Sequence, residues 1–486
     1  MGILTLLILT PLIGALLAIL PFTKNNYAKY IAVITSIIVC ILTFLVFVSF
    51  DSSDKTQQFQ LQENIINAFS VAPLNLNYHL GVDGISCIMI LLTGILGIPS
   101  VLVSWNITNK PKQYFFWLLI LQSSLFGVFS SLNMLLFFIF WEIELIPMFF
   151  LISMWGSGLR RHYSAMKFLI FTFGGSAFIL IGLLVLAFSG HSLDMSEPIY
   201  KTTQTLIPLS ALCLIFFLGF AVKLPVWPLH TWLPDAHSDA PTAGSMMLAG
   251  ILLKLGGYGL LRICIGLFPD TIDTWALLFF ILGLINLLYG AFVTMRQTDL
   301  KRLIAYSSIS HMGYVLIGFS SIATNSSIGA TGATLQMFTH GTITGLLFLL
   351  VGLVYEKAKT RSISELGGLV KRMPRITSLF MLAGLASLGL PGTSGFVSEL
   401  LVFIGAFNYM KIGTIIATIA IILTTGYMLW MIHKTMFGPP MERFDKINDA
   451  TDRELIAASI LGIPILVIGI YPQIIIEYLD LSLALF

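Results

Sequence analysis

Six ionisable residues interrupt long apolar stretches of the sequence, and these are the candidates for chemistry. A charged side chain at the centre of a membrane-spanning helix costs roughly 2.5–3.5 kcal/mol, so such residues pair with one another or with water and often mark ion pathways. Carboxylates, amines and imidazoles in one line can exchange protons when their proton affinities are adjusted by burial and by neighbours. We therefore predict a proton relay that consists of Glu142, Lys223, Lys254, His311, His340 and Glu399.

Lys223 lies beside a predicted break in its own helix. Pro225 and Pro228 have no backbone N–H, so the carbonyl oxygens near Ala221 and Leu224 lose their usual helical partners. Such a break admits water, which a static ion pair would not need. The alternative is that Lys223 only neutralises a buried glutamate.

Glu142 and Glu144 are two residues apart. On a continuous helix this spacing is a rotation of about 200°, so the two carboxylates face different directions. We expect Glu142 to line the relay beside Lys223. Glu144 is expected to face away from it, as a second site or as a contact to lipid headgroups or a subunit, and its replacement by alanine to be the milder of the two changes.

The two midspan histidines follow or adjoin hydroxyl side chains. His311 comes after Ser307 and Ser308, which share its helical face, and His340 follows Thr339. This setting favours proton shuttling over a simple hydrogen-bonded core role. No second histidine or cysteine lies at ligand spacing on either helix, so we expect no metal site.

Further polar residues lie near two helix breaks. His230, Asp235 and His237 follow the first break and are expected near the cytoplasmic exit, with a plain interfacial role as the alternative. A second break is predicted at 390–395, where Pro391 interrupts an apolar run, and Glu399 follows it at the expected end of the relay.

The composition is that of an all-α polytopic membrane protein. Of the 486 residues 57% are hydrophobic and 10% are charged, and the net charge of +3 gives no reason to expect nucleic-acid binding. Apolar stretches of about 20 residues predict about fourteen spans. Their limits are 2–21, 29–49, 82–105, 113–131, 132–152, 164–188, 207–238, 241–266, 274–293, 303–320, 329–355, 376–405, 412–434 and 454–472.

The two broken spans are five spans apart, and five is an odd number. Units built from spans 4–8 and 9–13 would therefore be inverted relative to each other, and paired breaks in inverted halves mark transport sites. The predicted organisation is an N-terminal three-helix segment with an outer loop or hairpin (1–112), a first five-helix repeat (113–270), a second, inverted repeat (271–440) and a C-terminal helix (441–486). The alternating residues 74–78 predict a short strand in the outer loop.

The basic residues predict the orientation. With the N-terminus outside, twenty of the 26 lysines and arginines fall in cytoplasmic loops, whereas the outer loops hold only Lys55, Lys201 and Lys411. Both termini are therefore expected on the outer side. The sequence has no phosphate-binding GxxxxGK[ST] loop and no dinucleotide fingerprint, so the energy for transport must come from an ion gradient or from partner subunits.

Several long motifs resemble the antiporter-like membrane subunits of respiratory complex I. They cover most of the chain and read FWEIELIP at 140–147, VKLP at 222–225, PLHTWLPDAH at 228–237, APTAGS at 240–245, LAGILLK at 248–254, IAYSSISHMG at 304–313, and LPG with FVSE between 390 and 399. Within that family the chain resembles the M type, the counterpart of mitochondrial chain 4 and of its photosynthetic equivalent. The glutamate at 399 and an end at Phe486, without a long lateral helix, favour this type. Glu144 resembles the photosynthetic branch, while 240–245 looks bacterial.

The resemblance implies a fourteen-helix proton-translocating subunit in which Glu142 tunes Lys223, Lys254 and the histidines relay protons, and Glu399 delivers them. It also implies no cofactor in this chain, with quinone, iron–sulfur clusters and FMN or NAD(P)H in partner subunits. The expected partners are the L-type and N-type chains and lipid, in a bacterial inner membrane or a thylakoid membrane. The donor could be NADH, NADPH or ferredoxin. An Mrp-type cation/proton antiporter subunit and a purely structural scaffold are the alternatives.

Overall fold

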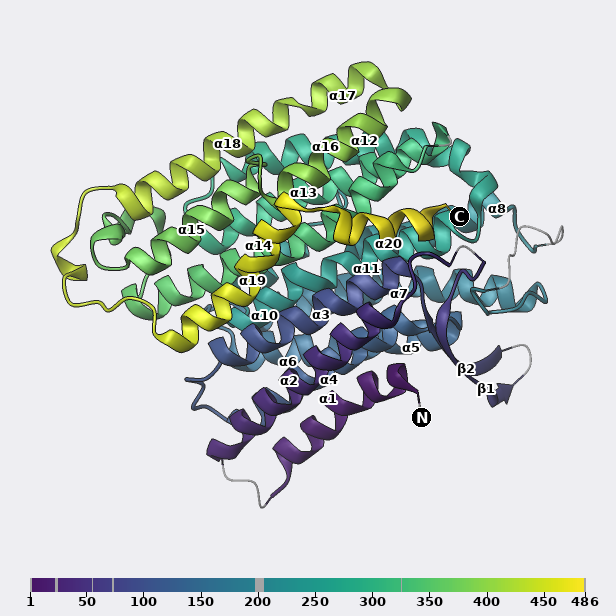
Figure 1. Cartoon of the computed structure of the whole chain (residues 1–486), viewed down its shortest axis with the longest axis horizontal. Coiled ribbons are helices and arrows are strands. Elements are labelled where there is room, and N and C mark those ends of the chain that lie inside the picture. Colours follow the sequence, from purple (N-terminus) through teal and green to yellow (C-terminus); the bar gives the residue numbers. More distant parts are fainter. Residues whose placement is uncertain are drawn as a thin grey trace.

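The chain forms a bundle of long helices with one β-hairpin at one end, as the computed structural model in Figure 1 shows. The structure describes residues 2–21, 25–54, 56–71, 74–196, 205–324 and 326–484. Lys24, Lys55 and Lys201, which enter the count of basic residues, lie outside them. The helices of the N-terminal segment are α1 (Ile3–Ile19), α2 (Asn25–Ser49), α3 (Gly84–Val103) and α4 (Pro111–Ser130).

The remaining helices follow in two groups. The first group is α5 (Met134–Ile143), α6 (Leu145–Trp155), α7 (Arg161–Phe188), α8 (Leu209–Lys223), α9 (Trp232–Asp239), α10 (Thr242–Met247) and α11 (Leu253–Gly259). The second is α12 (Ile272–Thr294), α13 (Leu300–Ser320), α14 (Ile328–Ala358), α15 (Pro374–Ser387), α16 (Ser394–Tyr409), α17 (Lys411–Ala417), α18 (Ile419–Ile432), α19 (Asp452–Ile470) and α20 (Gln473–Leu483). π-Helical segments at Leu248–Leu252 and Leu260–Ile265 flank α11.

The predicted class, an all-α polytopic membrane protein, is confirmed. Eleven helices in the described ranges are long and apolar enough to cross a membrane, and Ile3–Ile19, Leu209–Lys223 and Ser394–Tyr409 are shorter apolar helices. The separation of 113–131 from 132–152 is also confirmed, because α4 ends at Ser130 and α5 begins at Met134. The number of about fourteen spans, the inverted repeats and the segment boundaries stay predictions.

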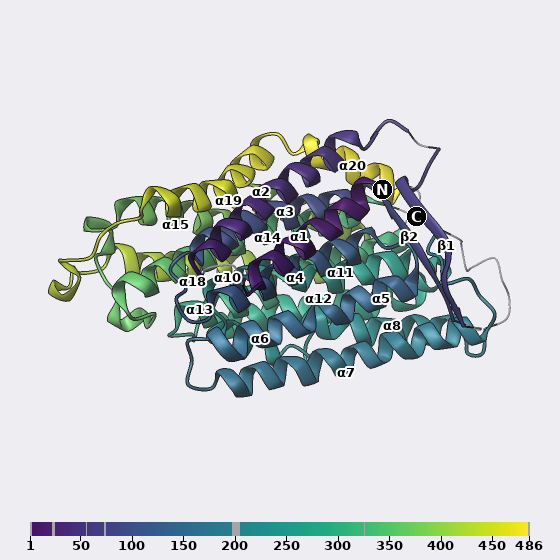
Figure 2. The same ribbon diagram turned by 90° about the horizontal axis from the view of Figure 1, so that it is seen from below.

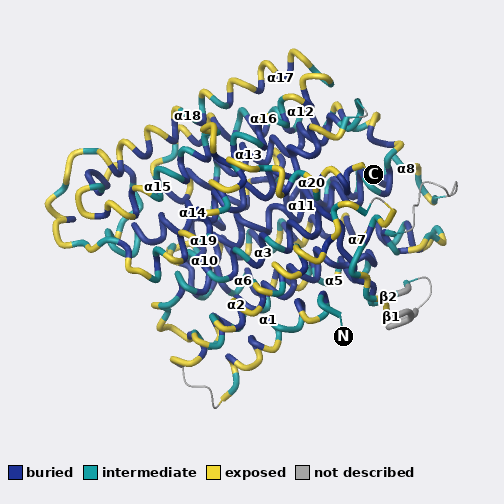
Figure 3. The backbone as a smooth tube through the Cα atoms, viewed as in Figure 1, coloured by how far each residue is buried: buried dark blue, intermediate teal, exposed yellow. Residues whose placement is uncertain are grey.

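The centre of the bundle is formed by the helices that carry the candidate residues. Thr242–Ile265 and α14 are buried along the whole of their most apolar stretch, whereas α2 is buried over only a third of its own. Figure 3 shows buried backbone along the middle of the molecule and exposed backbone on the outer helices. Polar side chains on the central helices are therefore shielded from lipid.

The predicted strand at 74–78 is confirmed and belongs to a longer hairpin. β1 (Gln60–Val71) pairs antiparallel with β2 (Leu74–Val82), and Figure 2 shows the hairpin standing across the helix ends. The carboxylate of Glu63 accepts a hydrogen bond from the backbone N–H of Leu4 at 2.7 Å. This contact stabilises the first turn of α1, where backbone N–H groups have no helical partner.

A second contact ties the hairpin to the loop after α7. Nδ1 of His79 lies 2.5 Å from a carboxylate oxygen of Asp194. Burial raises the pKa of Asp194, but the hydrogen bonds from His79 and Ser196 outweigh this effect and hold the pKa below its usual value. Asp194 is therefore ionised at neutral pH, and its contribution to stability is lost only as the pH falls through that lowered pKa.

The two ends of the bundle differ in charge. Both chain ends lie at the hairpin end, and the loops before α15 and after α18 lie at the opposite end (Figure 1). These loops carry Lys359, Arg361, Lys371, Arg372, Arg443 and Lys446. The arrangement agrees with termini on one side and basic loops on the other, and the assignment of the hairpin end to the outer side stays a prediction.

The first predicted break lies between α8 and α9. The N–H of Val226 donates to the carbonyl of Ala221, which Pro225 leaves without its helical donor. Asn286 of α12, fully buried, accepts from the N–H of Trp227 at 2.6 Å and donates to the carbonyl of Pro225 at 3.1 Å. The Asn286 side chain, from a distant helix, thus provides two of the hydrogen bonds that stabilise the broken segment.

The second predicted break lies between α15 and α16. Gly389 and Gly392 have φ angles of +76° and +90°, a backbone conformation that glycine adopts without strain. Pro391 lacks the N–H that would bond to the carbonyl of Ser387 in a continuous helix. That carbonyl therefore stays available to a side chain.

Candidate functional site

Lys223 forms an ion pair with Glu144 in the interior of the bundle. Lys223 is the last residue of α8, and the exposed fractions of the two side chains are 2% and 0%. The ammonium lies 5.2 Å from the ring centre of Trp141 and 5.8 Å from that of Phe168, within the range of cation–π attraction. The pair is therefore enclosed, with two aromatic walls.

The expectation that Glu144 faces away from Lys223 is wrong. The error concerned which helical face meets Lys223, since Glu144 keeps helical backbone angles (φ −68°, ψ −21°) between α5, which ends at Ile143, and α6, which begins at Leu145. Pro147 offers no N–H to the carbonyl of Ile143, which accounts for the interruption. The two glutamates do lie on different sides of the chain, and the turn places Glu144 on the inner side.

Glu142 lies on the other side of this turn and is partly exposed. Its neighbour Ile143 is exposed on the bundle surface, while the Oε1 atom of Glu142 itself is buried and has no hydrogen-bond partner among the described residues. Glu142 interacts electrostatically with Lys223 but forms no ion-pair contact with it. The described residues therefore show no direct Glu142–Lys223 pair, and the effect of Glu142 on Lys223 stays a prediction.

Lys254, His340 and His311 form a second cluster at the centre of the bundle. The Nζ atom of Lys254 lies 2.7 Å from Nδ1 of His340 and also donates to the carbonyl of Ala249. The ring centres of His340 and His311 are 5.5 Å apart, and all three side chains are buried. No carboxylate among the described residues forms an ion pair with Lys254, so its nearest proton-exchanging neighbour is His340.

Glu399 lies beside His311 at one end of this cluster, and its role as the end of the relay stays a prediction. Its Oε1 lies 3.7 Å from Nε2 of His311, and a Cβ atom on Gly389 would lie 3.0 Å from its Oε2. Tyr314 and Tyr427, both buried, interact electrostatically with the carboxylate. The second helix break therefore passes directly beside Glu399.

The ring of His311 is held by two backbone carbonyls. Nδ1 lies 2.7 Å from the carbonyl oxygen of Ser307, and Nε2 lies 3.0 Å from that of Ser387, the carbonyl freed by Pro391. Because a carbonyl only accepts, both contacts are hydrogen bonds at once only when both nitrogens carry a proton. Burial and the nearby Lys254 oppose that charge, whereas an ionised Glu399 carboxylate at 3.7 Å would stabilise it. The ring is thus placed to hold a proton and to release it.

The hydroxyl groups of Ser307 and Ser308 were expected to support proton shuttling by His311, but they bond to the backbone instead. Ser307 and Ser308 both donate to the carbonyl of Ile304 in their own helix. They satisfy the helix backbone, as serines commonly do inside membrane helices, and are not hydrogen-bonded to the imidazole.

His237 is fully buried inside the bundle, and its place near the cytoplasmic exit stays a prediction. Its ring stacks on Phe348 with a centroid distance of 4.6 Å, and neither ring nitrogen has a hydrogen-bond partner in the described ranges. It interacts electrostatically with Lys254 and with Lys301. His237 therefore lies between the central cluster and a second buried lysine.

Lys301 is a residue that sequence reasoning counted only as a basic loop residue. It is 2% exposed and donates to the carbonyl of Ala240 at 2.6 Å. It lines a cavity of about 320 Å³ at the end of the bundle opposite the hairpin, together with Ser104, Tyr114 and Glu356. Its place in a charged stretch at the start of α13 gave no signal of burial, since its surroundings come from a segment about 60 residues away.

Asp235 and His230 have surroundings typical of an interface. Asp235 is paired with Lys167 at 2.7 Å and approaches Arg302 at 4.0 Å, and its side chain is 26% exposed. His230 is buried with its ring edge-on to Tyr289. Neither contacts the Lys254 cluster, which favours the interfacial alternative for Asp235.

The candidate residues therefore form two groups. One is the Glu144–Lys223 pair with Glu142, and the other contains Lys254, His340, His311, Glu399 and the nearby His237. No hydrogen bond or ion pair between described residues joins Lys223 to Lys254.

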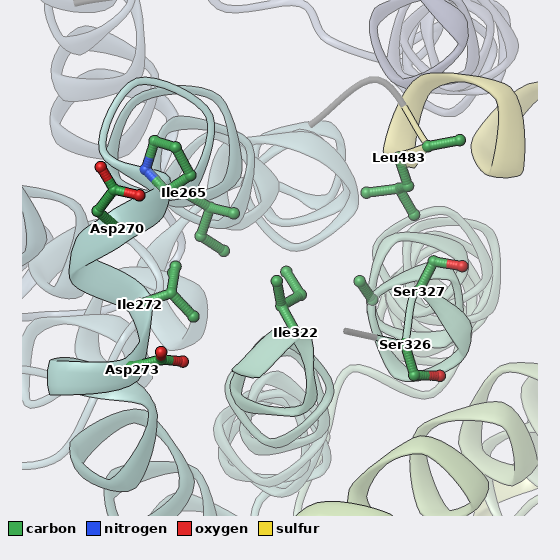
Figure 4. Close-up of a pocket in the computed structure, with 11 residues that line it drawn as sticks. Ile265, Asp270, Ile272, Asp273, Ile322, Ser326, Ser327 and Leu483 are labelled. Carbon is green, nitrogen blue, oxygen red and sulfur yellow. The ribbon is translucent and has the colours of Figure 1, made fainter. Parts of the chain in front are cut away.

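A cavity of about 590 Å³ at the hairpin end lies apart from both groups. Figure 4 shows Asp270 and Asp273 on one side of it and Ser326 and Ser327 on the other. Both carboxylates are exposed, and none of the relay residues lines the cavity. We therefore do not include it in the candidate site.

Asn286→Leu is expected to destabilise the first break. The change leaves the N–H of Trp227 and the carbonyl of Pro225 without partners, at a cost of about 1–3 kcal/mol for each buried group. The yield of assembled complex and its thermal midpoint should both fall. Asn408→Leu, at an exposed position of α16, is the matched control, and an equal effect of both changes would contradict this role.

The chain is similar in sequence to a known family of membrane proteins and to named relatives. A family described as "NADH:quinone oxidoreductase/Mrp antiporter, TM" matches residues 130–424. The NAD(P)H-quinone oxidoreductase chain 4 1 of Synechococcus sp. (strain JA-2-3B'a(2-13)) is 43% identical over 88% of this chain and 82% of its own length. The protein of the same name from Trichodesmium erythraeum (strain IMS101) is 39% identical over 98% and 91%.

Two solved structures have the same fold along nearly the whole chain. A chain of respiratory complex I from Thermus thermophilus with bound NADH has a TM-score of 0.89 and 26% identity, and the match covers 99% of this chain and 98% of that one. A chain of the Mrp complex from Dietzia sp. DQ12-45-1b has a TM-score of 0.87 over 100% and 97%, with 17% identity. The second match is evidence for the fold alone.

Proposed function

Because this chain belongs to the NADH:quinone oxidoreductase/Mrp antiporter transmembrane family, we propose that it is the proton-translocating chain 4 subunit of a complex I-type NAD(P)H–quinone oxidoreductase. Relatives with this name are similar over most of their length, whereas the likeness to the Mrp chain is limited to the fold. The oxidoreductase therefore has more support than the Mrp-type antiporter. A multisubunit membrane complex follows from both relatives and solved structures.

One observation carries the proposed mechanism: Lys254, His340, His311 and Glu399 form a buried line from the centre of the bundle to the second helix break. The distances are 2.7 Å from Lys254 to His340, 5.5 Å between the ring centres of His340 and His311, and 3.7 Å from His311 to Glu399. A scaffold would have no need of buried bases without counter-charges, because each costs stability. In this proposal Glu399 delivers protons beside the turn at Gly389.

Protons would enter from the opposite end of the bundle. The cavity beside Lys301 reaches a buried amine, and His237 interacts electrostatically with both Lys301 and Lys254. The unpartnered ring nitrogens of His237 leave room to accept a proton on one side and donate on the other. The order of transfer would be Lys301, His237, Lys254.

Redox chemistry would take place in partner subunits of the complex. We propose that quinone, iron–sulfur clusters and FMN or NAD(P)H are bound there, next to L-type and N-type membrane chains, in a bacterial inner or a thylakoid membrane. NADH, NADPH and ferredoxin all remain candidate donors. Energy from quinone reduction would reach this chain as a change in the Lys223 ion pair.

Membrane vesicles that contain the intact complex test this function. Quinone reduction should acidify the vesicle interior when the complex is inverted, and a quinone-site inhibitor should stop the acidification. A sodium gradient imposed without an electron donor should move no protons. Proton movement driven by sodium and indifferent to the inhibitor would favour the antiporter instead.

His237→Phe is expected to slow proton pumping severalfold without loss of assembly. Phenylalanine has nearly the same shape and can stack on Phe348, but it cannot carry a proton. Pumping per quinone reduced should be measured in the vesicles. His230→Phe is the matched control, because His230 adjoins the same break and does not interact with Lys254 or Lys301. Equal slowing in both variants would contradict the entry route.

A further inference from the structure

The turn between α5 and α6 presents two carboxylates to one lysine. Glu144 contacts the Lys223 ammonium directly, and Glu142 interacts with it from the other side of the turn. We propose that Glu144 and Glu142 are alternative partners of Lys223 in a two-position switch: Glu144 holds the ammonium at rest, and Glu142 receives it when Glu144 takes up a proton. This inference rests on the proposed function and adds Glu144 as a residue that changes its protonation state.

Unused acceptor atoms lie on both carboxylates. The Oε2 atom of Glu144 and the Oε1 atom of Glu142 are buried and have no hydrogen-bond partner among the described residues. Buried polar atoms are almost always satisfied, so two open acceptors near one ammonium need an explanation. An ammonium has three donors, and exchange between two partners would use these acceptors in turn.

The charge of the site also favours a change of partner. Two ionised glutamates and one ammonium give the turn a net charge of −1, and neighbouring carboxylates disfavour each other's ionisation. Addition of one hydrated proton to Glu144 makes the site neutral. The ammonium keeps its own protons, loses its charged partner and finds the remaining carboxylate at Glu142.

The side chain of Lys223 is long, and an aromatic ring lies beside its ammonium. Lys223 is the last residue of α8, and its four-carbon stem can turn without any change in the helix. The Trp141 ring lies beside the ammonium, and its indole N–H donates to the hydroxyl of Ser176 at 3.1 Å. Ser176 also lies beside Glu142. The aromatic face therefore extends from one carboxylate toward the other.

Double-mutant cycles in the intact complex test the switch. The variants are Glu144→Gln, Glu142→Gln and Lys223→Met, alone and combined, with the thermal midpoint of the complex as the readout. Glu144→Gln should lower the midpoint and Lys223→Met should restore it in the same chain, because removal of one partner alone strands a buried charge. Coupling between Lys223 and Glu142 should be small in the wild-type background.

The decisive measurement repeats one cycle in the Glu144→Gln background, where glutamine imitates the protonated residue. In that background the coupling between Lys223 and Glu142, measured from the thermal midpoints, should rise to the value that the Lys223–Glu144 cycle gives in the wild type. The proposal would be overturned if the Lys223–Glu142 coupling stays small in this background. It would also be overturned if that coupling is already large in the wild type. If Glu144→Gln fails to assemble, recovery of assembly by added Lys223→Met supports the pairing, and absence of recovery refutes it.

A measurement of proton pumping distinguishes a failure of this inference from a failure of the proposed function. Lys223→Met should abolish proton pumping if the chain is a proton translocator. Retained pumping together with the expected coupling would reject the function and keep the ion-pair assignment. Lost pumping without the change in coupling would reject the switch alone.

Discussion

Lys254→Met is expected to abolish proton pumping coupled to quinone reduction while the complex still assembles. The lysine is fully buried and has no carboxylate partner among the described residues, so a methionine of similar length fills its place without stranding a counter-charge. The line from His237 to His340 would lose the amine between them. A positioned proton carrier is typically worth about 10²–10⁴-fold in rate, and pumping should fall at least by the lower value.

The measurement is proton uptake per quinone reduced in vesicles, with the amount of assembled complex determined in parallel. Lys254→Arg is the control for charge, because a guanidinium keeps the positive charge but does not release its proton in proteins. Loss of pumping in both variants indicates proton transfer through the amine. Normal pumping in Lys254→Arg would show that only the charge matters.

The overall architecture was predictable because it depends on local features of the sequence. Hydropathy predicted the helical membrane class, and Pro225 and Pro391 predicted the two breaks, since each removes a hydrogen bond at a known position. Lys254, His311, His340 and Glu399 were predicted near midspan, which is consistent with the central cluster that they form, but the same position did not bring Lys223 into that cluster. Each of these inferences concerns one helix at a time.

The contacts that sequence reasoning missed are those between helices or at an unforeseen turn. Glu144 reaches Lys223 because the inner face of its span carries Glu144 and not Glu142, and the two-residue spacing alone does not say which of the two faces inward. Asn286 holds Pro225 from 61 residues away. Local patterns do not encode such pairings, and a single sequence offers no other signal for them.

Glu399→Gln is expected to stop proton delivery at the second helix break. Glutamine has the same shape and cannot accept a proton, so His311 loses the carboxylate that supports its charge at 3.7 Å. A neutral imidazole can donate to only one of the two carbonyls that now hold it. The bond from Nε2 to Ser387 or the bond from Nδ1 to Ser307 is therefore lost.

This prediction has a structural readout besides activity. Pumping should fall by about 10²-fold or more, and hydrogen exchange at residues 388–393 should increase if the Ser387 bond is the one released. Glu442→Gln, at an exposed position in the loop after α18, is the control for a neutralised glutamate. Unchanged pumping in Glu399→Gln would place the exit elsewhere. Lost pumping with unchanged exchange would show that Glu399 carries protons without holding the break through His311.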